Sequence, residues 1–389
     1  MSVIFYLGSI LKNIGLIVFI GATIFVFYLA FKDTLKRGLF CFIPSYHLYY
    51  ALEKLRHPWK KNINRVLWGG FWGIIIGYVF MNINSFSGVV NAIINGSISG
   101  SYFALMAFAI ILIFRTTDLV NFAQADMASY SVFFVLTLLG EHFITAIGLP
   151  EGGAIMPIGI AIVLALLLSG AFGVFTETVF IKPVQKQHPI SQIILTLGLG
   201  MFYTNLAAGQ LYWDQEEHRL PEIIGGNIKL GESIAFPIDG ILSLVVTVLI
   251  MLVIFALFKY TLLGIALRAT AQSQTTSRLM GINVNMVFIM SWAISVMLGG
   301  LAGIFYLAGK TINLYSTANL MLKGFSAAIL GGFSSLPGAV LGGFLLGIID
   351  YVLGLITNIK EILSFLIILI VLIVKPEGLL VKTKTVKKV

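Results

Sequence analysis

The chain has 389 residues, of which 58% are hydrophobic and only 11% are charged, with a formal net charge of +9. A soluble domain carries about 25% charged residues, so this composition excludes an ordinary soluble protein. The apolar runs are continuous and of span length, which favours membrane-spanning helices over a transmembrane barrel. We therefore expect an all-α polytopic membrane protein.

The basic residues cluster in short loops between apolar runs, which is typical of cytoplasmic loops and argues against nucleic acid as a partner. The single Cys41 excludes an internal disulfide. No metal site is expected, because the histidines fall in predicted loops and none pair at ligand spacing (His47, His57, His142, His188 and His218).

Residues 1–88 predict an N-terminal extension with two spans, Val3–Phe31 and Val66–Met81. The loop between them, Lys32–Arg65, carries eight basic residues against two acids, which places the loop in the cytoplasm and the N-terminus outside. Tyrosines and leucines within Ser45–Leu55 predict a helix at the level of the lipid headgroups, and a specific partner site is the alternative.

Six further spans are predicted before the glycine-rich part of the chain: Val89–Phe114, Leu119–Leu139, Ile158–Ile181, Ile190–Tyr212, Gly240–Phe258 and Met286–Ala308. The loops Glu141–Pro157 and Trp213–Asp239 are poor in basic residues, so we place them outside.

Polar residues inside these spans are candidates for a solute path, because such groups are costly in lipid and face the protein interior. Asn121 and Gln124 can share a helix face, whereas Asp126 points partly away unless the helix is broken. Hydrogen bonding between helices is an equally good explanation of the cluster. The predicted path residues are Asn95, Ser99, Tyr102, Asn121, Gln124 and Asp126.

Ionisable residues within or beside the spans are further candidates. Arg115 is a predicted partner for Asp118 or Asp126. Glu177 and Asp350 lie near span ends, so a merely interfacial position is an equal alternative.

A basic island without acidic residues lies between two long spans, from Leu262 to Asn285. Gly264 and Gly281 bracket Ile265–Met280, whose residues favour a helix. We interpret the island as a docking element on the cytoplasmic face, and an ordinary solvated loop is the alternative.

After Lys323 the helical pattern is interrupted by a predicted helix break at Gly331, Gly332, Pro337 and Gly338. We expect a short or re-entrant helix over Phe325–Phe333, a span over Leu336–Ile356 and a last span over Ile362–Val374. The basic tail 381–389 is then cytoplasmic. The total is about ten transmembrane helices. The chain also lacks the phosphate-cradling Walker motif, so we expect no ATP hydrolysis by this subunit.

The order of several motifs resembles the membrane subunits of branched-chain amino acid ABC importers. The resemblance covers roughly Val89–Leu380, and the domain we expect for it is 89–380. The motifs are NGSISGSYFALMAFAIILIF, VNFAQADM, IKPVQ, SQIILTLGLGMF, LLGIALRATAQSQTTSRLMGIN, LKGFSAAILGGFSSLPGAVLGGFLLGIID and LIVKPEGLL.

The resemblance implies a permease subunit that works with a second permease subunit, two cytoplasmic ATPases and a periplasmic or extracellular solute-binding protein. ATP and magnesium would be bound by the ATPases and no cofactor by this chain. The membrane would be the bacterial or archaeal cytoplasmic (inner) membrane, with the C-terminus in the cytoplasm. The implied ATPase-coupling residues lie in the island: Arg268, Ala269, Gln272, Ser273, Arg278 and Gly281.

Two features depart from the family pattern. Members often have a glycine before the acid in the segment that here is Gln124-Ala125-Asp126, and residues 1–85 have no counterpart. Related families carry urea, amides or sugars, so the solute is a weaker expectation than the ABC importer. A self-contained channel or secondary transporter, and a membrane scaffold, are the alternatives from other classes.

Overall fold

A computed structural model of the protein describes residues 86–139, 157–185, 187–209, 218–229, 235–333 and 335–356, together with Phe365 and Leu369. The predicted spans Val3–Phe31 and Val66–Met81, most of Ile362–Val374, and the basic tail lie outside the described residues. The count of ten spans and the domain boundaries therefore remain predictions. The chain divides into two compact units, residues 1–92 with 352–360 and residues 93–351 with 361–389. The second unit carries the features discussed below.

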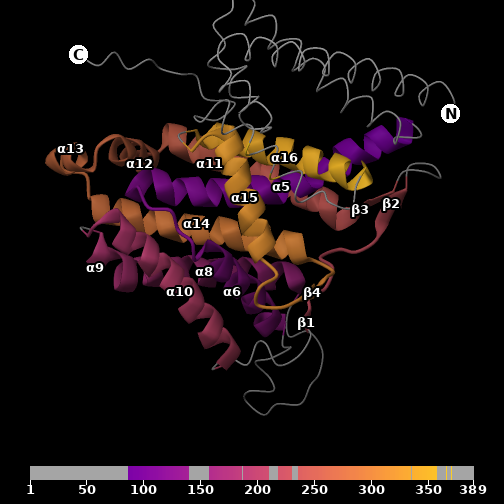
Figure 1. The fold of residues 1–389 in the computed structure, drawn as a ribbon, viewed down its shortest axis with the longest axis horizontal. Helices are drawn as coiled ribbons and strands as arrows, with labels where there is room; N and C mark the ends of the chain where they lie inside the picture. Colours follow the sequence, from indigo (N-terminus) through magenta and orange to yellow (C-terminus); the bar gives the residue numbers. More distant parts are fainter. Residues whose placement is uncertain are drawn as a thin grey trace, which may run out of the picture. The chain divides into compact units, whose positions relative to one another are not determined.

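The described part of the chain is helical, as predicted, with six helices long and apolar enough to cross a membrane. These helices agree with the predicted spans and are drawn in Figure 1. They are α5 (Phe86–Thr117), α8 (Ile158–Thr176) with its π-helical continuation η2 (Glu177–Ile181) and α9 (Lys182–Val184), α10 (Pro189–Gly209), α11 (Ile238–Tyr260), α14 (Val284–Leu307) and α16 (Leu336–Ile356).

Two shorter apolar helices, α6 (Gln124–Leu139) and α15 (Ala318–Gly331), complete the set of apolar helices in the described residues. α15 has 14 residues and is about 21 Å long, shorter than the ~30 Å hydrocarbon core of a bilayer. It begins earlier than the predicted short helix Phe325–Phe333, and Figure 1 shows it crossing the direction of its neighbours.

The prediction of one continuous span over Leu119–Leu139 is wrong. α5 ends where Asp118 takes a positive φ of 57°, and helix resumes only at Gln124. Alternate residues of the stretch between are buried: Leu119 is 3% exposed and Asn121 and Ala123 are fully buried, whereas Val120 and Phe122 are half-buried. Irregular backbone is tolerated at membrane depth when protein surrounds it, and here Asn121 Oδ1 accepts a hydrogen bond from the Ala123 N–H at 3.1 Å.

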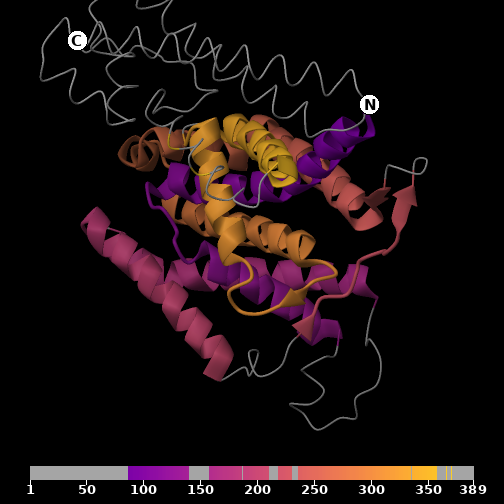
Figure 2. The same ribbon diagram turned by 45° about the vertical axis from the view of Figure 1, so that its right-hand side comes forward.

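α14 packs against α6 and α8 through small residues. A Cβ placed on Gly173 of α8 would lie 2.8 Å from the carbonyl oxygen of Trp292, and one on Gly303 would lie 3.3 Å from Val132 of α6. Small residues let helix backbones approach closely, which matters in a membrane because the hydrophobic effect does not drive helices together there. α10 runs obliquely beside this group (Figure 2) and is tied to α6 through Thr204 and Asp126.

α5 and α16 meet along a glycine seam, defined by Gly96 and Gly100 on α5 and Gly343 and Gly347 on α16. A Cβ on Gly96 would lie 2.7 Å from the Cα of Ile348, and one on Gly100 would lie 2.7 Å from the Cα of Phe344. Both pairs have the four-residue spacing that brings two helices into backbone contact.

The residues of the predicted helix break lie at the junction of α15 and α16. α15 ends at Gly331, and Gly332 has a φ of 93° that favours glycine. Ser335 Oγ then accepts a hydrogen bond from the Gly338 N–H at 3.0 Å, and Pro337 lies in the first turn of α16, where a proline is tolerated.

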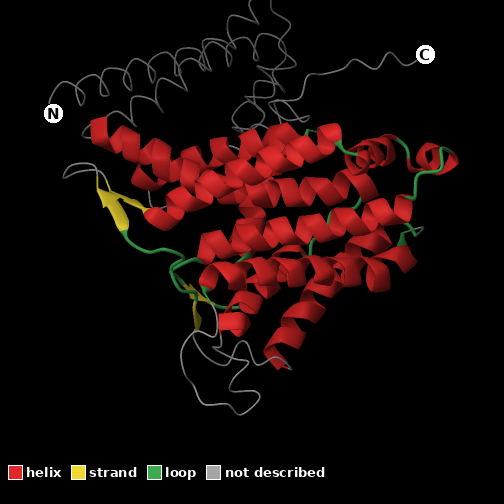
Figure 3. Ribbon diagram, turned by 180° about the vertical axis from the view of Figure 1, so that it is seen from behind, coloured by secondary structure: helices red, strands yellow, loops and turns green. Residues whose placement is uncertain are grey.

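The two ends of α11 and α14 carry different structures, as Figure 3 shows. At one end lies the island, with its short helices. At the other end β1 (His218–Arg219) pairs with β4 (Thr311–Ile312), and β2 (Asn227–Lys229) pairs with β3 (Ala235–Pro237), both antiparallel. With 23 residues, α11 separates these ends by about 34 Å.

Candidate coupling surface and solute path

The island consists of two short helices and not of the single helix predicted over Ile265–Met280. α12 (Leu262–Gln272) begins after Thr261, whose side chain accepts a hydrogen bond from the Gly264 N–H at 3.1 Å. Ser273 is extended, ends α12 and caps α13 (Gln274–Leu279) through a 3.2 Å bond from the Thr276 N–H. Ser273 is therefore the cause of the break, because a serine side chain satisfies the free amides of a new helix start.

Most of the predicted coupling residues are accessible: Arg268, Gln272, Arg278 and Gly281 are exposed, and Ala269 and Ser273 are half-buried. Large apolar side chains are exposed beside them, with Leu262 at 85%, Leu279 at 82% and Met280 at 78%. The island thus presents basic and apolar side chains together, which is the composition of a surface that meets another protein.

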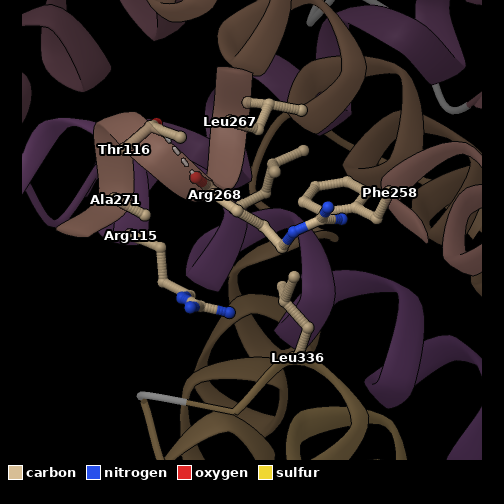
Figure 4. A pocket seen from close by; sticks show the side chains of 8 residues that line it. Arg115, Thr116, Phe258, Leu267, Arg268, Ala271 and Leu336 are labelled. Atoms are coloured by element: carbon tan, nitrogen blue, oxygen red, sulfur yellow. Dashed lines mark hydrogen bonds between the residues drawn. The ribbon is translucent and has the colours of Figure 1, made fainter. Parts of the chain in front are cut away.

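Arg115 and Arg268 line one shallow pocket between α5 and the island. Figure 4 shows Arg268 beside the ring of Phe258, with Arg115 extending from another wall toward Leu336. No carboxylate is among the residues that line the pocket: Leu112, Arg115, Thr116, Phe258, Leu267, Arg268, Ala271 and Leu336. Arg115 is therefore the second cation of this pocket, beside Arg268 of the island, whereas the sequence had suggested Asp118 or Asp126 as its partner.

Gln274 links the island to the membrane helices. Its Nε2 donates a hydrogen bond of 3.3 Å to the carbonyl oxygen of Thr116, in the last turn of α5. Sequence reasoning missed this residue, because the two partners are 158 positions apart and a glutamine in a polar loop carries no distinctive signal. A displacement of α13 would act on α5 beside Asp118, where the irregular stretch begins.

Asn121 and Gln124 lie together, as predicted, in a fully buried polar network. Asn121 Nδ2 donates to Gln124 Oε1 at 3.1 Å, and Gln124 Nε2 donates to the carbonyl oxygen of Ser295 in α14 at 3.2 Å. Ser295 Oγ donates to the carbonyl oxygen of Ala109 in α5 at 2.7 Å. The network joins three membrane helices, which is the interhelical bonding considered as the alternative to a solute path.

Asp126 lies elsewhere, as its spacing from Asn121 had suggested. Its Oδ1 accepts a 2.7 Å hydrogen bond from Thr204 Oγ1, and a Cβ on Gly200 would lie 2.5 Å from its Oδ2. The carboxylate thus faces α10. Ala125, directly before this acid, is 8% exposed.

The three predicted path residues of α5, Asn95, Ser99 and Tyr102, are all half-buried. Tyr102 lines a pocket on the β-strand side of the helices, and its ring is edge-to-face with Tyr306 at 6.1 Å. The six predicted path residues are therefore distributed over different surroundings, and their role in transport remains a prediction.

Of the remaining ionisable candidates, Asp118 is exposed, Asp350 is half-buried and Glu177 is buried. Lys323 of α15 and Asp350 of α16 form an ion pair, with side chains only 8% and 14% exposed. Glu177 is fully buried and accepts a 3.0 Å hydrogen bond from Gln185 Nε2. Both acids lie near the ends of their helices, Glu177 directly after α8 and Asp350 near the end of α16, so the interfacial alternative stays open. Within the described residues, no three His, Cys, Asp or Glu side chains come together as a metal site.

Residues 92–373 match the family described as branched-chain amino acid transport system / permease component. The high-affinity branched-chain amino acid transport system permease protein LivH of Escherichia coli is 29% identical over 298 residues, which cover 74% of this chain and 93% of that protein. The permease protein BraD of Pseudomonas aeruginosa is 29% identical over 302 residues, covering 74% of this chain and 94% of that protein.

A relative named for another substrate, the nucleoside ABC transporter permease protein NupC of Lactococcus lactis, is 28% identical over 284 residues, covering 62% of this chain and 85% of that protein. No solved structure matches the chain. The family match extends over most of the described helices and includes the island and the α15–α16 junction. The chain is thus a multi-pass membrane protein and belongs to the permease components of branched-chain amino acid transport systems, as a non-catalytic subunit of an ABC importer.

Proposed function

We propose that this permease carries branched-chain amino acids across the cytoplasmic membrane of a bacterium or archaeon, driven by ATPases that dock on the island. ATP and magnesium would be bound by those partner subunits. A second permease subunit and an external solute-binding protein would complete the complex, with the C-terminus of this chain in the cytoplasm.

The observation that carries the proposal is the exposed basic and apolar surface of α12 and α13. Arg268 and Arg278 are exposed within it, and Leu279 and Met280 form an apolar tip. Such a surface suits a groove that is apolar at its centre and acidic at its rim. The hydrogen bond from Gln274 to α5 supports a route by which movement of the ATPase reaches the spans as a rigid-body displacement.

Co-purification of the complex tests the docking. Arg268→Glu places an acid opposite the proposed acidic rim, and we expect retention of the ATPase subunits to fall by about tenfold or more. Insertion into the membrane should be unchanged, because Arg268 is exposed. The matched control is Arg219→Glu, an exposed arginine at the opposite end of the spans. Equal retention of the ATPases in both variants, with normal ATP-driven uptake, would contradict the docking role.

The choice of amino acids as solute rests on the names of the relatives that share more than nine tenths of their length with this chain. The nucleoside permease matches a smaller share and supplies the competing solute. Uptake of labelled leucine and labelled uridine into proteoliposomes containing the complete transporter separates the two. Leucine uptake that requires ATP supports the proposal, whereas uptake without ATP or ATPases would favour a self-contained transporter.

A further inference from the structure

The end of the helices opposite the island carries a pocket whose chemistry has no role in coupling. The pocket has a volume of about 220 Å³ and is lined by Tyr102, Glu222, Gly226, Asn227, Pro237, Asp239, Gly240, Phe305, Tyr306, Ala308 and Lys310. Its walls come from α5, from the starts of β2 and α11, and from the end of α14. The pocket therefore lies about the length of α11, roughly 34 Å, from the island.

Short backbone ladders hold the charged walls of this pocket in place. Leu220 N donates to the carbonyl oxygen of Lys310 at 3.2 Å, and Gly309 N donates to that of Leu220 at 2.9 Å, which extends the β1–β4 pairing. On the other side, Ile238 N donates to the carbonyl oxygen of Gly226 at 3.0 Å. The chain segment that bears Glu222 is thus fastened both to the end of α14 and to the start of α11.

Asp239 fixes the same segment and is itself occupied. Its two oxygens accept hydrogen bonds from the backbone N–H groups of Ile223 (2.9 Å), Ile224 (2.8 Å) and Gly225 (3.2 Å). A carboxylate that already accepts three amide hydrogens has little remaining capacity for a ligand. Asp239 therefore positions the segment that bears Glu222. Of the two carboxylates that line the pocket, that of Glu222 belongs to an exposed residue.

The Glu222 side chain lies between two glycines in left-handed conformation. A Cβ on Gly225 (φ 76°) would be 2.9 Å from Glu222 Oε2, and one on Gly309 (φ 73°) would be 3.1 Å from Glu222 Cγ. On the same pocket, Lys310 Nζ lies 4.1 Å from the centre of the Tyr306 ring, which favours the position of its ammonium group. A carboxylate and an ammonium group therefore both line this pocket, together with aromatic and aliphatic side chains.

We infer that this pocket is the entry site for a small zwitterion, whose ammonium group meets Glu222 and whose carboxylate meets Lys310. Tyr102, Phe305 and Ala308 would accept its aliphatic part. The volume of about 220 Å³ is below the range of roughly 300–1,000 Å³ for sites of drug-sized ligands, which favours a compact solute. The inference rests on the proposed function, because the docking of ATPases on the island is what makes the pocket face the outside.

Protection of a single thiol tests the inference. Asn227→Cys in a Cys41→Ser background places the thiol on the pocket wall, and Ala308→Cys is a second reporter if the first variant does not fold. In washed spheroplasts that contain the complete transporter but no solute-binding protein, a membrane-impermeant maleimide should label the thiol. We expect leucine to slow this labelling several-fold, whereas isovalerate and isopentylamine, which each lack one charge, should not.

Charge variants in the reporter background sharpen the test. Glu222→Gln and Lys310→Gln should each raise the leucine concentration for half-protection by about tenfold or more. Arg219 is exposed and lies outside the pocket, so Arg219→Gln should leave the leucine concentration for half-protection unchanged. Absence of protection, or equal protection by leucine and isovalerate, would overturn the site. ATP-driven uptake, measured in intact cells that contain the complete transporter and its solute-binding protein, separates the hypotheses. Uptake in those cells without protection in the spheroplasts rejects only the pocket, and absence of uptake by the unmodified transporter in those cells rejects the proposed function.

Discussion

The glycine seam between α5 and α16 and the island α12–α13 use the same residue type in opposite ways. In the seam, Gly96 and Gly100 are required because a side chain would meet the backbone of the facing helix. In the island, Gly281 has open space around it and is required only by its φ of 82°. The seam leaves no room for adjustment, whereas the island is open to a partner. Substitutions in the first region should therefore change folding, and those in the second should change coupling.

The largest effect should come from filling the seam. Gly347→Leu forces the backbones of α5 and α16 apart, because the space beyond its Cα is occupied by Gly100 and Gly96. We expect little or no folded protein by fluorescence-detected size exclusion. Gly198→Leu on α10, where a Cβ would meet nothing within 4 Å, is the control and should fold normally. Similar yields for both variants would remove the basis of the comparison.

The second-largest effect is expected at the ion pair between Lys323 and Asp350, which joins α15 to α16. Asp350→Leu alone leaves the Lys323 ammonium group buried without its carboxylate and should destabilise the protein by about 3–5 kcal/mol. The double variant Lys323→Met with Asp350→Leu should recover most of that loss, because an apolar pair of similar volume needs no desolvated charge. Thermal unfolding of the purified variants measures both. A double variant as unstable as the single one would assign Asp350 a role beyond this pair.

A smaller effect is expected at the end of the island. Gly281→Ala requires an L-residue to take a positive φ, which costs about 1–2 kcal/mol locally. The strain should weaken ATPase retention several-fold while leaving the melting temperature of the isolated permease nearly unchanged. Gly281→Asn is the control, since asparagine tolerates this conformation better. Loss of overall stability in the alanine variant would show that the island is part of the folded core.

The smallest effect should follow from removing the link between the island and α5. Gln274→Ala deletes the hydrogen bond to the Thr116 carbonyl, a contribution of about 0.5–1.5 kcal/mol. We expect a few-fold decrease in solute transported per ATP hydrolysed, with ATPase retention unchanged. Thr275→Ala, at the exposed neighbouring position, is the matched control. An unchanged transport ratio in Gln274→Ala would exclude this bond from the transmission of movement.

Much of the architecture could be predicted, because a membrane span is recognised from a continuous run of apolar residues. The bounds of α8, α11 and α14 differ from the predicted spans by a few residues. The helix break after Gly331 was predictable for the same reason, since Gly332 and Pro337 constrain the backbone locally. Errors arose where a short local signal overrode the general pattern. Ser273 divides the predicted helix of the island, and the helix of the fourth predicted span begins only at Gln124, after an irregular stretch that follows Asp118.

The candidate sites were less predictable. The sequence placed Asn121 and Gln124 together because they are three positions apart, although Asn121 lies before α6 and not on its face. It separated Asp126 from Asn121 because these two are five positions apart. It gave no indication of the bond from Gln274 to Thr116 or of the ion pair between Lys323 and Asp350, whose partners are distant in the chain. For the loop that contains Glu222, the sequence predicted only a position on the outer side of the membrane and no binding site.

By itself, then, the sequence determined the helical membrane class, most of the described spans, the basic island and the glycine-rich junction, since each depends on residues adjacent in the chain. Only the tertiary structure decided which polar groups meet. It joined Asn121 and Gln124 to Ser295 on α14, directed Asp126 to Thr204 on α10, and brought Glu222 beside Lys310 through the β1–β4 ladder. The physical reason is that a buried polar group is costly unless it forms a hydrogen bond. In a bundle of long helices, the available partners are those on the neighbouring helices, which small residues allow to pack closely.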